Sequence, residues 1–235
     1  MLTFFFAGSQ TSSVAIQNLI FALCKHPEYQ QKILDELDTS IIKPYLQKVD
    51  SGSAVKGSER NLLNLLNYEN CGDLQLYSSC FNESLRMMPP VQYSSSVRMS
   101  EDVQCEKLKI RKGDIIAIMM NNLCNDPEEW IQPERFIPER FDDKSRFFLT
   151  PKGTRRNPYS FSPFLGGSRI CIGKTFIEVV SKLTVPTLLS NFKIEFVDEV
   201  DRESVPYMHN NMVASRMPQF KALISQRQSA FSVKL

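Results

Sequence analysis

A single cysteine between two glycine-bearing turns most constrains what this chain can fold into. The stretch from Phe164 to Gly173 has the sequence FLGGSRICIG, with Arg169 two residues before Cys171. Glycine lacks a Cβ and accepts positive φ, so a backbone rich in glycine can pass close to a flat group. Loop amides can then donate hydrogen bonds to the sulfur, and Arg169 is a permanent cation suited to holding a carboxylate. The pattern favours a thiolate that binds a metal over a Gly-rich turn with a buried free cysteine.

The residues after Gly173 predict a helix from about Lys174 to Leu189, because apolar side chains recur at helical spacing. They are Phe176, Val179, Val180 and Leu183. A helix that begins here directs the partial positive charge of its N-terminus at Cys171, which stabilises a thiolate.

The stretch resembles the cysteine-ligand loop of the cytochrome P-450 superfamily, the haem-thiolate monooxygenases. The family pattern is Phe-x-x-Gly-x-Arg-x-Cys-x-Gly, and the chain fills its fixed positions with Phe164, Gly167, Arg169, Cys171 and Gly173. The resemblance implies that these residues bind haem b (heme, iron protoporphyrin IX). It also implies that Cys171 is the axial ligand of the iron.

Residues 1–24 predict one helix, which carries the sequence AGSQTS from Ala7 onward. This segment resembles the family's oxygen-binding helix, Ala/Gly-Gly-x-Asp/Glu-Thr. The resemblance implies that the small Ala7 and Gly8 approach the haem and that Thr11 opens the helix locally to hold a proton-delivering water. Gln10 stands where the family commonly has an acid, and an amide does not exchange a proton at neutral pH. A helix with a polar stripe is the alternative interpretation.

Glu83 and Arg86 lie three residues apart, so a helix places them on one face. Alone, such a pair is typical of a solvated surface. The tetrapeptide Pro-Glu-Arg-Phe then occurs twice, and its second copy follows a Trp-x-x-Pro-x-x-Phe stretch that begins at Trp130. The resemblance therefore selects Arg140 as the third member of a buried structural network that locks the cysteine loop beneath the haem. It leaves Arg135, in the first copy, at the surface.

Two further groups of cations have alternative interpretations. Arg98 follows a proline break in an expected strand, where the resemblance implies a contact with a haem propionate, although an exposed strand arginine fits the sequence nearly as well. The basic segment 144–156, with Lys174, is suited to dock an acidic electron donor. A solvated insertion loop is the favoured interpretation of that segment.

The expected fold class is mainly α with small β-sheets (α+β), the C-terminal portion of the cytochrome P-450 fold in one domain over residues 1–235. The expected helices cover 1–24, 27–47, 62–66, 74–87 and, after the cysteine loop, the rest of 164–189. The expected strands cover 94–99, 103–110 and 114–120, with a β-rich segment over 192–227. Residues 50–60 predict a flexible loop, and residues 125–165 an ordered, irregular meander.

Composition sets outer limits on function. Hydrophobic residues make up 42% of the chain, charged residues 23%, and the net charge is +2, which is ordinary for a globular protein and argues against a nucleic-acid partner. No apolar run reaches the roughly 18 residues that a transmembrane helix needs. The six cysteines form no C-x-x-C pair, so neither a zinc site nor c-type haem attachment is indicated. Free thiols are expected.

The resemblance implies a monooxygenase that inserts one oxygen atom from O2 into a small, lipophilic organic substrate. Because no flavin or nicotinamide motif is visible, two electrons would come from a separate reductase. A thiolate-haem isomerase or lyase acting on peroxides, and a non-catalytic truncated remnant, are the open alternatives.

The resemblance begins at the oxygen-binding helix and continues to the C-terminus. The N-terminal half of the family's pattern is therefore expected to be absent, together with its membrane anchor and much of the substrate cavity. We expect this chain alone to bind haem weakly and to turn over poorly. A full-length form with an anchor would lie on the cytosolic face of the endoplasmic reticulum.

Overall fold

The computed structural model describes residues 2–51, 65–198, 209–210, 215–216 and 220–227. Its α-helices are α1 (Leu2–Lys25), α2 (Pro27–Leu37), α3 (Lys43–Asp50), α5 (Gln75–Met87), α6 (Met120–Asn125) and α7 (Lys174–Asn191). The strands are β1 (Val97–Arg98), β2 (Val103–Cys105), β3 (Leu108–Ile110), β4 (Ile115–Ile116), β5 (Phe192–Phe196), β6 (His209–Asn210), β7 (Ser215–Arg216) and β8 (Ala222–Gln226). They pair antiparallel as β1–β4, β2–β3, β5–β8 and β6–β7. The expected mainly α fold with small sheets is confirmed.

Three expected elements differ in detail. The strand expected over 103–110 is a hairpin, because Glu106 turns the chain with φ 46° between β2 and β3. The strand expected over 114–120 keeps only β4 before α6 begins at Met120. The helix expected over 27–47 is α2 and α3 joined by a π-helical turn at Asp38–Ile42. The expected loop at 50–60 and short helix at 62–66 lie mostly outside the described residues.

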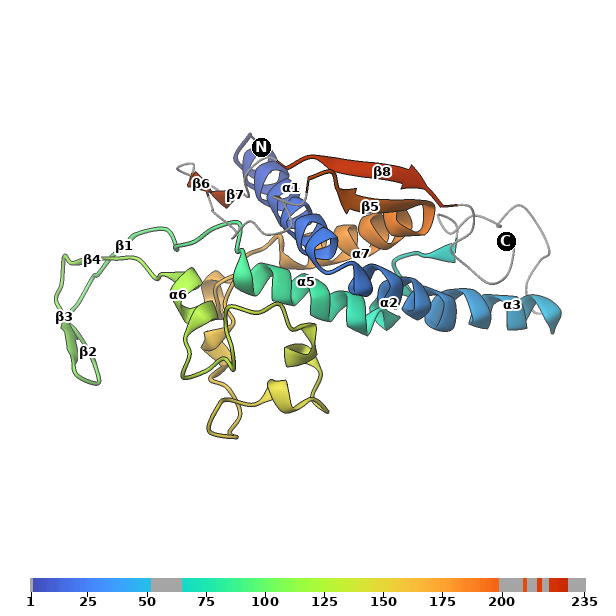
Figure 1. Cartoon of the computed structure of the whole chain (residues 1–235). Helices are drawn as coiled ribbons and strands as arrows, with labels where there is room; N and C mark the ends of the chain where they lie inside the picture. Colours follow the sequence, from blue (N-terminus) through green and yellow to red (C-terminus); the bar gives the residue numbers. More distant parts are fainter. Residues whose placement is uncertain (1, 52–64, 199–208, 211–214, 217–219, 228–235) are drawn as a thin grey trace.

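Helices α1, α2, α5 and α7 pack together around one apolar core, with the β5–β8 pair beside α1 (Figure 1). Leu19 and Leu23 of α1 are fully buried there. The rings of Phe21, Phe196 and Phe220 meet edge to face at centroid distances of 5.3, 5.4 and 5.5 Å. Such pairs add stabilisation beyond their buried area, so they hold the sheet against α1.

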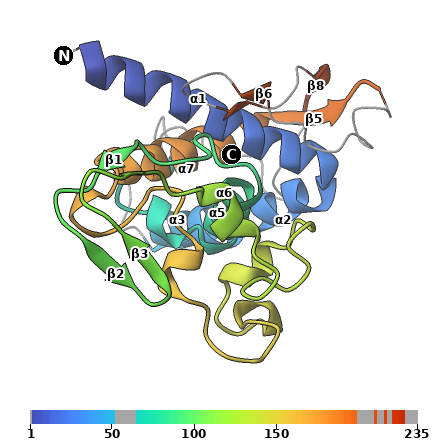
Figure 2. The same ribbon diagram turned by 90° about the vertical axis from the view of Figure 1, so that its left-hand side faces the viewer.

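The two halves of α1 have different surroundings. Its first turns extend beyond the helices that pack under its second half (Figure 2). Phe4, Phe5 and Phe6 are 70%, 77% and 54% exposed, whereas Val14, Ala15 and the apolar residues after them are mostly buried. Within the described part of the chain, no helix combines the length and apolarity needed to span a bilayer.

Helix α5 receives its N-terminal cap from a distant residue. Leu74 stands at the N-cap position and has no polar side chain to offer. The Glu36 carboxylate of α2 instead accepts hydrogen bonds from the backbone N–H groups of Leu76 and Tyr77, at 2.6 and 2.9 Å. Burial raises the pKa of Glu36, while these backbone donors act against the rise. The cap fixes α5 to α2, and α5 carries Glu83 and Arg86.

Candidate functional site: the cysteine loop and the network behind it

The cysteine loop, residues 164–173, closes on itself through backbone hydrogen bonds. The N–H of Cys171 donates to the carbonyl of Phe164 at 2.9 Å, and the N–H of Ile170 donates to the carbonyl of Gly167 at 3.3 Å. A 3-10 turn at Gly167–Arg169 forms the tip, and Gly167 has φ +64°, which favours glycine. The two glycine-bearing turns therefore do hold the cysteine in a defined backbone position.

The side chains around Cys171 are open to solvent. Cys171 is a free, exposed cysteine. Its apolar neighbours Ile170, Ile172 and Phe176 are 48%, 85% and 61% exposed. Helix α7 begins at Lys174, whose N–H lies 3.3 Å from the Cys171 carbonyl, so the positive helix end stands beside the cysteine. An accessible thiol flanked by uncovered apolar side chains fits the donor set and the apolar contact that a haem-thiolate site requires.

Behind the loop, Glu83, Arg86 and Arg140 form a fully buried set, which we call the Glu83 network. The guanidinium of Arg86 donates to both carboxylate oxygens of Glu83, at 2.7 and 3.0 Å. Arg140 donates to Oε1 of Glu83 at 3.0 Å, and the N–H of Ile137 donates to the same oxygen at 2.8 Å. All three charged side chains have zero exposure. The structure thus brings together the three residues that the sequence selected.

The other guanidinium N–H groups of the network donate to oxygens of Cys124 and of the meander, which comprises residues 125–165. Arg86 donates to Pro133 O at 2.7 Å and to Cys124 O and Asn125 Oδ1 at 3.0 Å. Arg140 donates to Ile131 O and to Gln132 O. Burial lowers the pKa of Arg140, and the Glu83 charge acts against that shift. A buried ion pair stabilises a protein only when its remaining donors are also hydrogen-bonded. These contacts meet that condition and connect α5 to the meander.

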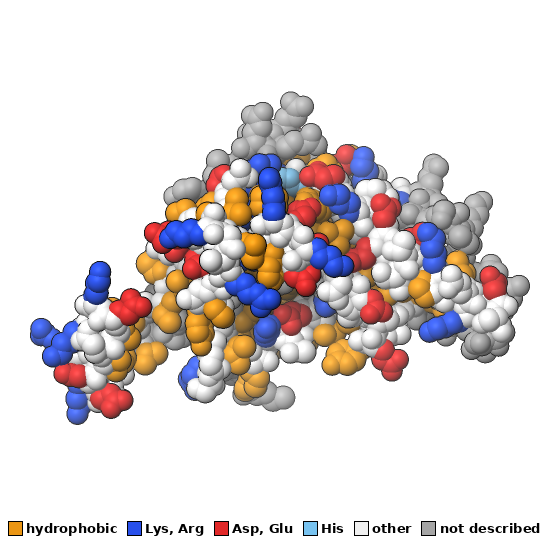
Figure 3. All heavy atoms as spheres, turned by 90° about the horizontal axis from the view of Figure 1, so that it is seen from below, with side chains coloured by type: hydrophobic (Ala, Val, Ile, Leu, Met, Phe, Trp, Pro, Cys, Tyr) orange, Lys and Arg blue, Asp and Glu red, His pale blue; other side chains and the backbone are white. Residues whose placement is uncertain are grey.

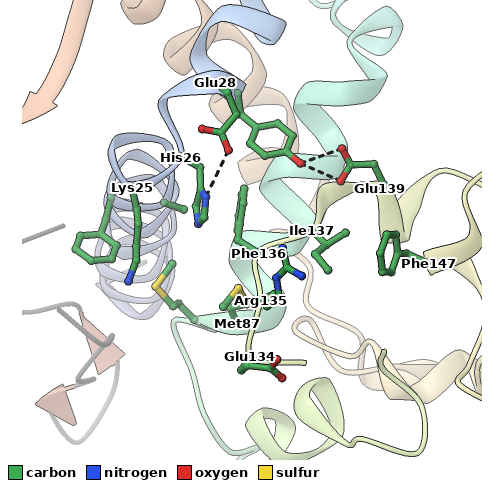
Figure 4. Close-up of a pocket in the computed structure, with 14 residues that line it drawn as sticks. Lys25, His26, Glu28, Met87, Glu134, Arg135, Phe136, Ile137, Glu139 and Phe147 are labelled. Atoms are coloured by element: carbon green, nitrogen blue, oxygen red, sulfur yellow. Dashed lines mark hydrogen bonds and ion pairs between the residues drawn. The ribbon is translucent and has the colours of Figure 1, made fainter. Parts of the chain in front are cut away.

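A second contact, between Tyr29 and Glu139, ties α2 to the meander, and it was not predicted from the sequence. The Tyr29 hydroxyl of α2 lies 2.9 Å from each oxygen of the Glu139 carboxylate. Dashed lines mark the two contacts of Glu139 in Figure 4. Burial, with the Glu139 hydrogen bond, raises the pKa of Tyr29. The only signal for Glu139 was its place in the second Pro-Glu-Arg-Phe copy, and Tyr29 gave none beyond helical periodicity. Arg135, in the first copy, is exposed as expected.

A cleft of about 530 Å³ lies between α1, α2, α5 and the meander. Figure 4 draws the residues that line it. His26 lies in it, stacked on Phe136 with ring centroids 5.0 Å apart. Burial lowers the pKa of His26, with Glu28 opposing the shift. Neither Cys171 nor Thr11 lines this cleft. It is therefore separate from the cysteine loop.

On α1, the Thr11 hydroxyl donates to the carbonyl of Ala7 at 2.7 Å. The expectation that Thr11 opens the helix is wrong, because α1 is α-helical from Leu2 to Lys25. A carbonyl oxygen has two lone pairs, so it accepts this hydroxyl without giving up the helical ladder. Gln10 is partly buried, and a Cβ added to Gly8 would meet no atom within 4 Å.

The other predicted cations are dispersed. Arg98, exposed on β1, donates to the carbonyl of Gly113 at 3.0 Å, and Arg169 is exposed at the tip of the cysteine loop. In Figure 3 basic and acidic side chains are interspersed over the face seen from below. Within the basic segment 144–156, Arg156 departs from the favoured solvated interpretation. It is partly buried, because its guanidinium binds backbone carbonyls.

Comparison with known proteins gives a consistent family. The family model for Cytochrome P450 matches residues 1–223. Human cytochrome P450 3A7 is 30% identical over 194 residues, which are 83% of this chain and 33% of that protein. Cytochrome P450 4c3 of Drosophila melanogaster is 30% identical over 196 residues, 83% of this chain and 32% of that protein. Against these two relatives the match spans about a third of the relative's length. The family match, which includes α1, the Glu83 network and the cysteine loop, shows that the chain belongs to the cytochrome P450 family.

Proposed function

We propose that this chain supplies the haem-thiolate site of a monooxygenase that inserts one oxygen atom from O2 into an organic substrate, with electrons from a separate reductase. Proteins of the family bind haem b and are oxidoreductase monooxygenases. The observation that carries the proposal is the free, exposed Cys171 thiol in a loop closed by the hydrogen bond from its own N–H to Phe164.

In this proposal the Cys171 thiolate would ligate the haem iron. When bound, the haem supplies dioxygen activation, which a thiolate ligand favours. Phe164, Gly167 and Gly173 shape the loop, and the α7 N-terminus stabilises the thiolate form of Cys171. Arg169 and Arg98 hold propionates, because a guanidinium binds a carboxylate through two parallel hydrogen bonds. The Glu83 network keeps the loop in place and takes no part in the chemistry.

In the same proposal, helix α1 would form the wall of the haem site where dioxygen binds. The side-chain space beside Gly8 is open, so Ala7 and Gly8 present a low surface that can approach a flat cofactor. The Thr11 hydroxyl donates to Ala7 but keeps its lone pairs, with which it can accept a hydrogen bond from water. Gln10 can orient that water by hydrogen bonding but cannot exchange a proton with it. Thr11 is therefore the residue that would hold water on the α1 side of the haem.

The exposed apolar side chains at the start of α1 indicate what kind of partner this surface would contact. Phe4, Phe5 and Phe6 leave a large apolar area uncovered on α1, which favours a lipophilic substrate or further apolar polypeptide there. Since the Cys171 surroundings are open in the same way, we expect the 235-residue chain alone to bind haem weakly. Tight stoichiometric binding with normal turnover by this chain would contradict that expectation.

The decisive experiment is a haem titration followed by the spectrum of the reduced, carbon-monoxide-bound protein. The parent chain should give the strongly red-shifted Soret band that a thiolate ligand produces, and Cys171→Ala should not. Cys105→Ala is the matched control, since Cys105 is also a free, exposed cysteine. An unchanged spectrum in Cys171→Ala would overturn the proposal. Product formation from an organic hydroperoxide without reductant, and none with reductant and O2, would instead favour an isomerase or lyase.

A further inference from the structure

Two adjacent arginines of the basic segment have opposite environments. Arg155 is exposed, whereas Arg156 is partly buried. The guanidinium of Arg156 donates to the carbonyl of Arg140 at 2.6 Å and to the carbonyl of Phe147 at 2.8 Å. It also lies 4.3 Å from the ring centroid of Trp130. Arg156 thus contacts the backbone of the Glu83 network at Arg140 and two further parts of the meander, at Trp130 and Phe147. Arg155 is left at the surface.

The charged group that acts most strongly on Arg156 is the like-charged Arg140, so hydrogen bonds and stacking on Trp130, rather than an ion pair, hold the Arg156 side chain in place. Arg86 and Arg140 pair with the buried carboxylate of Glu83. The guanidinium groups of Arg86 and Arg156 lie 5.3 and 4.3 Å from the ring centroid of Trp130. Burial, followed by repulsion from Arg140, lowers the pKa of Arg156 to about 10. A planar guanidinium can donate to two carbonyls while it stacks on an aromatic ring, which a lysine ammonium cannot do.

The chain after Arg156 leads directly to the cysteine loop. The N–H of Asn157 donates to the Glu129 carboxylate at 2.8 Å, beside Trp130. Two residues further, the ring of Tyr159 lies so close to Gly166 that a Cβ there would be 2.9 Å from Tyr159 Cε1. The ring of Tyr159 therefore lies against the backbone at Gly166 and links the segment after Arg156 to the loop that carries Cys171.

We propose that Arg156 is a positioning residue, which joins the Glu83 network and Trp130 to the segment that supports the cysteine loop. It sets the place of that loop without touching the cofactor. Its consequence for haem binding rests on the proposed function, but its effect on the loop does not. Arg156 is also less exposed than Arg155, and its guanidinium is held by backbone carbonyls.

The test compares Arg156→Lys with Arg155→Lys in the haem-free chain. Trp130 is the sole tryptophan of the sequence, so its fluorescence reports directly on the Arg156 contact. Arg156→Lys keeps the charge but should change Trp130 emission. It should also speed hydrogen exchange of the Cys171 amide on the order of tenfold, because that amide is protected only while the loop is closed on Phe164. Arg155→Lys should change neither.

Three outcomes would overturn the proposal: unchanged Trp130 emission, unchanged exchange at Cys171 despite altered emission, or equal effects in the two variants. Haem titration gives a separate readout. Arg156→Lys should weaken haem affinity on the order of tenfold and reduce the thiolate-type fraction of the spectrum, because supporting contacts tune a ligand's position. If the parent chain itself shows no thiolate spectrum, the proposed function fails, whereas the exchange result still decides the role of Arg156.

Discussion

The Glu83 network and the cysteine loop lie within one chain but differ in what completes them. Glu83, Arg86 and Arg140 have zero exposure, and oxygens of the meander and the residue before it accept the donors left over after the ion pairs. By contrast Cys171 is exposed, and its neighbour Ile172 is 85% exposed. The chain therefore satisfies its own supporting network, while the surface around the thiol is left open for contact.

This difference separates stability from function along the chain. Buried, matched charges are costly to break because one lost partner leaves another charge unpaired in a low dielectric. An exposed thiol contributes little to folding, so its value lies in what it binds. The following predictions test that separation.

The largest effect is expected for Glu83→Gln. Removing the one carboxylate leaves Arg86 and Arg140 buried without a counter-charge, so unfolding should become easier by about 3–5 kcal/mol. Urea denaturation of the haem-free chain measures this. Glu134→Gln is the control, because Glu134 is exposed and should change stability by less than about 0.5 kcal/mol. Equal effects in the two variants would show that the network does not support the fold.

A smaller loss is expected for Glu36→Gln, which weakens the remote cap of α5. The two N–H groups of Leu76 and Tyr77 donate to different oxygens of the carboxylate. Glutamine replaces one of these oxygens by an NH2 group, which is a donor, and removes the charge. The expected cost is about 1–2 kcal/mol, measured by thermal or urea unfolding. Glu69→Gln, on an exposed glutamate, serves as the control. Unchanged stability in Glu36→Gln would mean that α5 is positioned without its cap.

An effect confined to acid pH is expected at His26. Burial lowers its pKa in the folded state below the ordinary 6.5, so the unfolded chain takes up the proton first as pH falls. Stability should therefore decrease as pH drops through 6.5 toward the folded-state pKa, and above this window His26 contributes no slope. His26→Phe keeps a ring over Phe136 and should flatten the curve, whereas His209→Phe tests the chain's other histidine. A slope unchanged in His26→Phe would contradict the assignment.

The smallest effect on folding is expected for Cys171→Ser. An exposed thiol replaced by a hydroxyl should leave the unfolding free energy of the haem-free chain within about 0.5 kcal/mol. Cys80→Ser is the comparison, because Cys80 is fully buried on α5. Burying a hydroxyl there away from water should lower the unfolding free energy by about 1–3 kcal/mol. If Cys171→Ser were the more damaging change, the loop would be part of the stability core and the comparison of the two regions would fail.

The helices could be predicted from the sequence where the signal lies within the helix itself or at its ends. The helical spacing of the apolar residues after Gly173 indicated α7 closely, and the helices expected over 1–24 and 74–87 agree with α1 and α5. The turn at Glu106 was missed, because no glycine or proline marks it and a non-glycine residue adopts the positive φ. The expected local opening of α1 at Thr11 was wrong, because the sequence shows that a hydroxyl can bond to the i−4 carbonyl but not whether the backbone hydrogen bonds of the helix then break.

The site was predictable in its members and less so in its supports. The order of the motifs selected Glu83, Arg86 and Arg140, and the choice of Arg140 over Arg135 agrees with their burial. Tyr29 and Glu139, which lie 110 residues apart, gave no joint signal although they form a tether. Sequence proximity carries no information about such a pair.

By itself the sequence determined the periodic helices, the glycine turns around Cys171 and the helix that follows them, because these depend on local backbone preferences. Only the tertiary structure decided which of the adjacent Arg155 and Arg156 enters the interior. Two identical side chains were separated by the carbonyls of Arg140 and Phe147 and the face of Trp130. A guanidinium is buried where distant segments bring acceptors to it, and that convergence exists only in the folded chain.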